Sequence, residues 1–280
     1  MKKKIISIVF LVIVIACVVR LYIDNNAIQT TEMEITSDKI PESFDGYKIL
    51  QISDFHSRKF DDGNFKLIRE IDKVEPDIIV LTGDMVTGNE TDFTTFFNLV
   101  EELAKRYKMY FVPGNHEVVL SAASKQEFLD CFEKNNITFL DNNSVEIVKE
   151  GESVNLYGLW YEKKYYTSQE LTSEDIFNRI GESNSERYNI LLAHQPKYFP
   201  LYQAWGADLI LSGHIHGGMV RLPILGPLFS PDGELFPKYA EGQYVLENST
   251  LIVSRGVGIG SRGFRVLNRP ELVLITLKTA

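Results

Sequence analysis

All five histidines of the 280-residue chain lie at or just after the ends of short apolar runs, and two carboxylates and one amide lie beside them. This shared position indicates one site, because ligands of open α/β sheets gather where the strands end. Imidazole and carboxylate ligands suit Mn, Fe, Zn or Ni better than Mg or Ca, and the lack of thiolates argues against a structural zinc site. The pattern predicts two divalent transition-metal ions, with Mn expected first, near Asp54, His56, Asp84, Asn115, His116, His194, His214 and His216.

Two pairs of these residues are separated by a single position. In an extended strand the side chains of residues i and i+2 point the same way. Asp54 and His56 are therefore expected to bind one ion together, and His214 and His216 to bind neighbouring ions at a shared rim.

The apolar runs have the length and composition of buried strands, and helical patterns lie between the first few of them. Residues 64–74, 93–107 and 125–135 carry apolar positions at i, i+3 and i+4 spacing, so strand and helix alternate as in a parallel α/β arrangement. The C-terminal third lacks helical patterns, which predicts a second, more antiparallel sheet packed on the first. The expected strands there are residues 244–248, 249–255, 263–267 and 271–278.

Residues 1–23 differ from the rest of the chain, because Lys2–Lys4 precede a long apolar stretch that predicts a single transmembrane helix. The positive-inside rule keeps the lysines cytoplasmic, so the chain is expected at the cell membrane with its catalytic domain extracytoplasmic. A cleaved signal peptide and a lipoprotein box ending at Cys17 are the alternatives. Residues 24–46 are expected to be a linker with one edge strand, and residues 47–280 a single folded domain.

Net charge limits the range of partners. The formal charge of −9 and the pI near 5.2 argue against bulk nucleic acid, which requires a basic face. A small phosphorylated substrate remains compatible, because a few cations in a site can dominate its local field.

The ordered motifs Asp54-x-His56, Gly83-Asp84, Gly114-Asn115-His116-Glu117, His194 and Gly213-His214-x-His216 resemble the calcineurin-like metallophosphoesterase superfamily over residues 47–278. The resemblance implies a four-layer αββα sandwich of two mixed β-sheets flanked by helices. The strings at 216–231, 236–244 and 253–258 resemble its membrane-associated bacterial branch, some of whose members hydrolyse the pyrophosphate of UDP-diacylglucosamine.

The same resemblance implies roles for the site residues. One ion would be held by Asp54, His56, Asp84 and His216, and the other by Asp84, Asn115, His194 and His214, with Asp84 bridging. His116 would be the general acid, and Glu117 would orient its neighbours. Two divalent ions bring +4 against −2 from the two aspartates, which leaves a site suited to an anionic phosphate.

The sequence therefore predicts a membrane-tethered, metal-dependent phosphoesterase acting on a phosphodiester or pyrophosphate of a phosphorylated small molecule or a lipid-linked substrate. A non-catalytic, metal-stabilised binding protein at the membrane or wall is the alternative, disfavoured because every motif position is present.

Other features are less specific. Residues 258–263 match GxGxxG but precede a strand pattern, so no helix N-terminus is available for a dinucleotide. Loops 161–174 and 222–239 are expected to select the substrate. Four arginines could bind a substrate phosphate or make surface ion pairs: Arg58, Arg221, Arg255 and Arg262. Four aromatic residues could flank an apolar ligand or pack in a β-hairpin: Trp160, Tyr161, Tyr165 and Tyr166.

Overall fold

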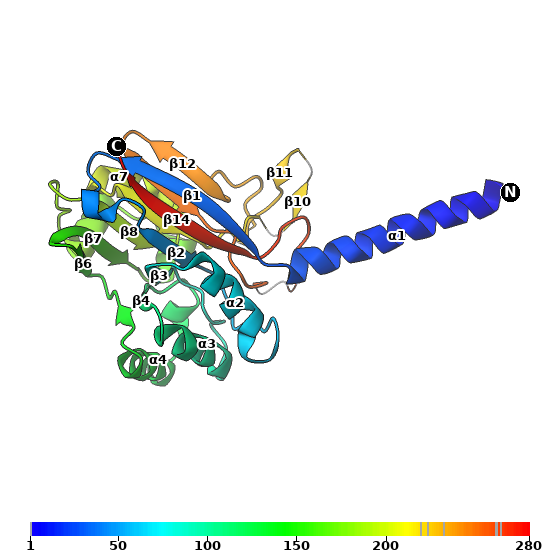
Figure 1. Ribbon diagram of the computed structural model, residues 1–280, viewed down its shortest axis with the longest axis horizontal. Helices are drawn as coiled ribbons and strands as arrows, with labels where there is room; N and C mark the ends of the chain where they lie inside the picture. Colours follow the sequence, from blue (N-terminus) through cyan, green and yellow to red (C-terminus); the bar gives the residue numbers. More distant parts are fainter. Residues whose placement is uncertain (1, 219, 223, 232, 261–262, 264) are drawn as a thin grey trace.

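Two six-stranded mixed sheets pack face to face, with helices on their outer faces (Figure 1). The structure is a computed structural model. It describes residues 2–280 except 219, 223, 232, 261–262 and 264. The predicted four-layer sandwich is therefore confirmed. The first sheet has the order β1 (Gln29–Ser37), β14 (Glu271–Thr279), β2 (Lys48–Ile52), β3 (Ile78–Leu81), β4 (Lys108–Phe111) and β5 (Thr138–Phe139).

The second sheet faces the first across the central core. Its order is β12 (Gly242–Leu246), β13 (Ser249–Val253), β9 (Leu209–Ser212), β8 (Asn189–Ala193), β7 (Glu152–Leu159) and β6 (Ser144–Lys149). A separate two-stranded ribbon, β10 (Arg221–Leu222) with β11 (Gly226–Pro227), lies outside both sheets.

Alternation along the strands divides the core into three layers. In β2, Ile49 points into the core between the sheets, whereas Leu50 and Ile52 point to the helices on the outside. The outer face of the first sheet is covered by α2 (Phe65–Val74), α3 (Thr94–Ala104) and α4 (Ala122–Lys134), and that of the second by α5 (Lys164–Thr167), α6 (Ser173–Ile180) and α7 (Phe199–Trp205).

The expected second sheet packs on the first, but the C-terminal strands form only part of it, and the sheet is mixed rather than mainly antiparallel. The strands β12 and β13 extend the sheet that β8 and β9 already form, and β14 crosses to the first sheet, where it pairs antiparallel with β2. In the described part of residues 263–267 only Val266 pairs, in an isolated bridge to Val220. Pairing between distant segments decided this arrangement, and local pattern does not encode such pairing.

The segment 24–46, expected to be a linker, contributes to the sheet. All nine residues of β1 pair in parallel with β14, so the predicted edge strand exists and is longer than expected. Before it, α1 (Lys2–Asn26) extends away from the domain, and within the described residues it is the one helix long and apolar enough to cross a membrane.

The two sheets are joined by a polar contact below the ends of their strands. The Gln51 side chain of β2 donates to Thr82 Oγ1 (2.9 Å) and to the Ser212 carbonyl of β9 (2.8 Å), and all three residues are fully buried. A buried amide whose N–H groups are bonded to both sheets fixes the relative position of its neighbours. The loops that follow β2, β3 and β9 are thereby brought to one place.

Candidate metal centre

All eight predicted site residues lie in loops that follow strands, and five of them have left-handed backbone conformations. The expectation that Asp54 and His56 lie in an extended strand was wrong, since β2 ends at Ile52 and both residues have left-handed backbone conformations (φ 51° and 49°). Asp84, His214 and His216 are also left-handed. Such conformations cost about 1–3 kcal/mol each and are concentrated at functional sites.

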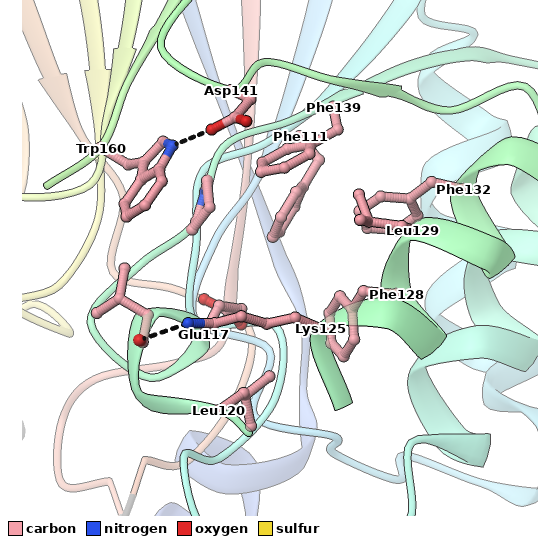
Figure 2. Close-up of a pocket in the computed structure, with 12 residues that line it drawn as sticks. Phe111, Glu117, Leu120, Lys125, Phe128, Leu129, Phe132, Phe139, Asp141 and Trp160 are labelled. Carbon is pink, nitrogen blue, oxygen red and sulfur yellow. Dashed lines mark hydrogen bonds between the residues drawn. The ribbon is translucent and has the colours of Figure 1, made fainter. Parts of the chain in front are cut away.

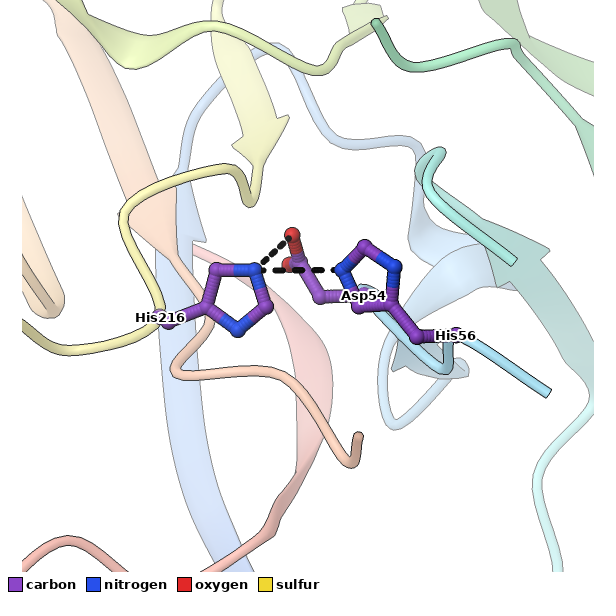
Figure 3. Close-up of side chains that lie close together, drawn as sticks. All are labelled: Asp54, His56 and His216. Atoms are coloured by element: carbon purple, nitrogen blue, oxygen red, sulfur yellow. Dashed lines mark hydrogen bonds and ion pairs between the residues drawn. The ribbon is translucent and has the colours of Figure 1, made fainter. Parts of the chain in front are cut away.

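One cluster of possible ligands contains Asp54, His56 and His216, whose side chains converge from two sheets (Figure 3). His216 Nε2 lies 3.3 Å from Asp54 Oδ1 and 3.2 Å from His56 Nε2. All three side chains are at least nine-tenths shielded from solvent. One carboxylate oxygen and two imidazole nitrogens at this spacing could hold a metal ion.

A second cluster contains Asp84, His194 and His214. His194 Nε2 lies 3.2 Å from Asp84 Oδ2, while its Nδ1–H donates to the Thr82 carbonyl at 2.7 Å. Such a bond fixes the ring and directs the other nitrogen to a ligand. Asp84 Oδ2 also lies 4.0 Å from His56 Nε2, so this carboxylate stands between the two clusters.

Buried atoms without partners support the metal assignment. Asn115 Oδ1 and His194 Nε2 are buried and have no hydrogen-bond partner, although buried polar atoms of the folded chain are nearly always paired. His194 Nε2 also lies 3.9 Å from Asp54 Oδ1 and 3.2 Å from Asp84 Oδ2, so it faces two carboxylates. Carboxylate, amide and deprotonated imidazole groups are the ligands that a divalent transition-metal cation takes, so the residues present fit metal binding.

Burial and charge set opposite protonation states in the two clusters. Burial lowers the pKa of His56 to about 4. His194 is equally buried, but the charge of Asp84 and its bond to that carboxylate outweigh burial and raise the pKa of His194 to about 10. Burial raises the pKa of Asp54, whereas His194 and its neighbours hold the pKa of Asp84 below its usual range despite burial.

His116 lies at the opening of the site with a fixed tautomer. Its Nδ1 accepts the Gly88 backbone N–H at 2.8 Å, so the imidazole proton is carried on Nε2. Nε2 lies 3.8 Å from Asp84 Oδ2, and a quarter of the side chain is exposed. An N–H group therefore faces the space between the clusters and solvent.

Glu117 supports the loops from below. Its carboxylate accepts backbone N–H groups of Asp84 (2.8 Å), Gly114 (2.8 Å) and Val86 (3.1 Å). Burial first, and then the charge of Asp84, raise the pKa of Glu117 to about 7. The expected orienting role agrees with these three bonds.

Two glycines allow the loops to approach closely. A Cβ at Gly114 would lie 2.3 Å from Asp84 Oδ1, and one at Gly213 would lie 2.4 Å from Asp54 Oδ2. Both distances are far below van der Waals contact, so any side chain there would displace a carboxylate.

The family is shown by sequence. The pattern described as calcineurin-like phosphoesterase matches residues 47–218, more than half of the chain. The chain belongs to this family. It is thus a metallophosphoesterase, a hydrolase of phosphoric esters that depends on divalent metal.

Bacterial and animal relatives agree with this membership. The chain is 28% identical to the metallophosphoesterase YkuE of Bacillus subtilis over 273 residues, covering 92% of this chain and 88% of that protein. It is 30% identical to the metallophosphoesterase Cj0846 of Campylobacter jejuni, covering 91% of this chain but 65% of the relative. A transmembrane protein with metallophosphoesterase domain from Danio rerio is 26% identical, with 96% and 62% covered.

Solved structures are more distant. The phosphopantetheinyl hydrolase of Mycobacterium tuberculosis matches with a TM-score of 0.47 and 11% identity, covering 78% of this chain and 90% of that one. A dimetal phosphatase from Danio rerio matches with a TM-score of 0.45 and 11% identity, covering 76% and 88%.

One supporting residue of this phosphoesterase was not predicted. Arg265 is 1% exposed and donates to the backbone carbonyls of Gly258, Arg255 and Gly256, in the loop that lies against Asp54. No sequence signal identifies it, because its partners are backbone atoms.

The other arginines have different outcomes. Arg221 pairs with Glu241, and Arg255 with Glu271, so both make ion pairs. Arg58 lies beside His56 at an opening of the site, which leaves a substrate role for it as a prediction. Arg262 lies outside the described residues.

Two cavities adjoin the domain core, and one of them borders the metal centre. An apolar cavity of about 210 Å³ lies under α4, where Lys125 reaches the Val118 carbonyl and Trp160 donates to Asp141 (Figure 2). Its described lining includes Glu117 but none of the predicted metal ligands and not His116. A cavity of about 320 Å³ is lined by Tyr166, Lys197, Ile215 and Lys238, directly beside His194 and His214. This cavity and the opening lined by His56 and Arg58 both adjoin the metal centre.

Proposed function

We propose that this phosphoesterase hydrolyses a phosphodiester or pyrophosphate with a binuclear centre, and that α1 anchors it in the cell membrane with the domain outside. The observation that carries the proposal is the convergence of two ligand clusters on Asp84, which stands within 4.0 Å of imidazole nitrogens from both. A carboxylate between two ligand sets suits a pair of ions better than a single ion.

The clusters support one proposed set of ligands for each ion. Asp54, His56 and His216 would hold the first ion and His194, His214 and Asn115 the second, with Asp84 shared. Bound ions supply Lewis acidity that polarises the phosphoryl group and makes water acidic enough to react near neutral pH. With only two carboxylates among the ligands, the loaded site keeps a net positive charge that favours an anionic phosphoester.

His116 would act on the leaving group. Its Nε2–H faces the space beside Asp84, and the Gly88 N–H fixes the ring so that this proton points there. The proton can be donated to the oxygen that leaves phosphorus. A positioned acid of this kind contributes about 10²–10⁴-fold in rate.

The tether and the substrate class rest on two further observations. The helix α1 has 25 residues, and none of its most apolar 18-residue stretch is buried against the domain. The cavity beside His194 and His214 carries Lys197 and Lys238, which can bind a second phosphate or another anionic group. We therefore favour a phosphodiester or pyrophosphate, on a small molecule or a lipid, over a simple monoester.

The test uses the full chain in detergent, stripped of metal and reloaded with Mn²⁺, with bis(p-nitrophenyl) phosphate and p-nitrophenyl phosphate as substrates. We expect two ions per chain by metal analysis and faster cleavage of the diester. His116→Ala should keep both ions and lose about 10²–10⁴-fold in rate. Gln126→Ala, on an exposed position of α4, is the control and should match the parent.

Binding of two ions without hydrolysis of either compound would contradict the catalytic proposal and favour the metal-stabilised binding protein. Binding of a single ion would contradict the binuclear centre while leaving hydrolysis intact.

A further inference from the structure

The ribbon β10–β11 and the segment after it expose four large apolar side chains. Ile224 is fully exposed at the tip beside Leu225, and Leu235 and Phe236 are more than half exposed. The second pair is attached to the segment that directly follows β11, because Leu235 forms an isolated β-bridge with Phe229 and the Phe236 N–H donates to the Leu228 carbonyl at 3.0 Å. Soluble surfaces rarely gather large apolar groups in this way unless they are interaction sites. We call Ile224, Leu225, Leu235 and Phe236 the apolar tip.

Backbone strain accompanies this exposure. Ile224 has φ 72° and Phe236 has φ 51°. A left-handed conformation is a genuine outlier for a β-branched residue, and such strain costs about 1–3 kcal/mol. The side chain of Ile224 is fully exposed, so contacts within the chain do not offset that cost. A partner outside the chain would offset it.

The base of the ribbon is joined to the end of α1. Val220 bridges Val266, and the Arg221 N–H donates to the Val266 carbonyl at 3.1 Å. The residues on either side of Val266 hold α1, since the Arg265 N–H donates to Asn25 Oδ1 and the Leu267 N–H to Asp24 Oδ2 (2.9 and 2.7 Å). Figure 1 shows β10 and β11 on the side of the domain from which α1 leaves.

The C-terminal end of α1 is docked on the domain rather than flexibly attached. Asp24 is fully buried, and basic side chains of the domain bind the last carbonyls of the helix. Arg58 donates to the Asn25 carbonyl and Lys66 to the Asn26 carbonyl, while Arg269 donates to those of Ala27 and Ile28 (2.9 Å each). Cations at these carbonyls satisfy the helix end. The direction of α1 is therefore fixed relative to the apolar tip.

The openings of the metal centre lie between these elements. One is lined by His56, Arg58 and Ile259, and the Arg58 side chain in turn contacts α1. The cavity on the other side is bordered by Glu234 and Pro237, the residues that flank Leu235 and Phe236. A surface that meets both α1 and the apolar tip would therefore lie close to both openings.

We propose that the apolar tip enters the lipid surface of the membrane that α1 spans and holds the openings of the metal centre against that surface. The inference rests on the tether in the proposed function and narrows the substrate to phosphoesters carried by lipids. A bilayer is favoured as the occupant because the base of the ribbon that bears the tip is joined, through Val266 and its neighbours, to the end of a helix of membrane-spanning length.

The test uses the full chain with Cys17→Ala and Cys131→Ala, which removes the two native thiols. Single cysteines replace Ile224 or Phe236, and each carries an NBD fluorophore. The labelled chains are reconstituted into vesicles of phosphatidylcholine and phosphatidylglycerol, with or without doxyl-labelled phosphatidylcholine. Val12→Cys in α1 reports the tether, and Val148→Cys, an exposed apolar position on β6 at the far end of the domain, is the matched control.

We expect the labels at positions 224 and 236 to shift to shorter wavelength and to lose most of their fluorescence to the doxyl lipid, as the label at position 12 does. The label at position 148 should do neither. A label at position 12 that is quenched, beside unquenched labels at 224 and 236, overturns the inference and leaves the tether standing. A blue shift without doxyl quenching also overturns it, because a second protein copy would then cover the tip. An unquenched label at position 12 refutes the tether and this inference together, while hydrolysis is measured separately.

Discussion

The two ligand clusters of the metal centre contain the same kinds of side chain but differ in where a proton is held. In the cluster of Asp54, His56 and His216, burial keeps both imidazoles neutral, since their pKa values are lowered. In the cluster of Asp84, His194 and His214, the Asp84 carboxylate lies 3.2 Å from His194 and raises its pKa to about 10. Position relative to one carboxylate, rather than burial, therefore decides which imidazole must lose a proton to bind an ion.

The largest effect is expected from removing the shared carboxylate. Asp84→Asn should lower the affinity for both ions. The loss should exceed the roughly 10- to 100-fold loss of affinity that follows removal of a residue that only orients a ligand. The substitution should also abolish the difference in protonation between His194 and the imidazoles of the first cluster, because His194 loses its anionic partner. Metal analysis after dialysis gives the first result, and histidine NMR of the metal-free protein gives the second. Retention of one tight ion would show that Asp84 is not shared.

A smaller effect is expected when one cluster is altered at a time. His56→Ala should remove the first ion and leave the second, and His194→Ala should do the reverse. Each variant should bind one ion per chain by isothermal titration calorimetry. Loss of both ions from either variant would mean that the clusters are not separate sites.

Glu117 offers a finer test, because it holds the Asp84 and Gly114 backbones and touches neither histidine of the first cluster through the bonds described. Glu117→Ala should lower the affinity for the second ion about 10- to 100-fold and the affinity for the first ion less. Competition with a metal-binding dye measures both affinities. Equal weakening of the two ions would indicate that Glu117 supports the whole centre.

The last prediction concerns pH. His194 must release its proton to bind, and its pKa in the metal-free protein is raised, so the affinity of the second ion should rise by about tenfold per unit as pH increases towards 10. Burial lowers the pKa of His56 to about 4 and lowers that of His216 as well, so both imidazoles are already neutral near neutral pH and release no proton there. Calorimetry in buffers of different ionisation enthalpy should detect release of one proton from His194. No release from His194 would refute the difference between the clusters.

The sequence was sufficient for much of the site and for less of the fold. The grouping of Asp54, Asp84 and the histidines followed from their positions after apolar runs, although the argument from an extended strand was wrong because both Asp54 and His56 lie in a left-handed loop. The place of β14 beside β2 was not predictable, since it depends on pairing across more than 200 residues of sequence. The role of Arg265 was not predictable from sequence either, because the groups that accept its hydrogen bonds are backbone carbonyls, which every residue carries.

The metal centre connects the two sheets in the same way as the Gln51 amide, which joins β2 to β9. Each cluster takes side chains from loops of both sheets, Asp54 and His56 with His216 in one, and Asp84 with His194 and His214 in the other. Ions bound there would cross-link the two halves of the sandwich and stabilise the folded state in proportion to their occupancy. Chelation would then act on this protein as a mild denaturant as well as an inhibitor, and metal supply would set how long the folded enzyme persists.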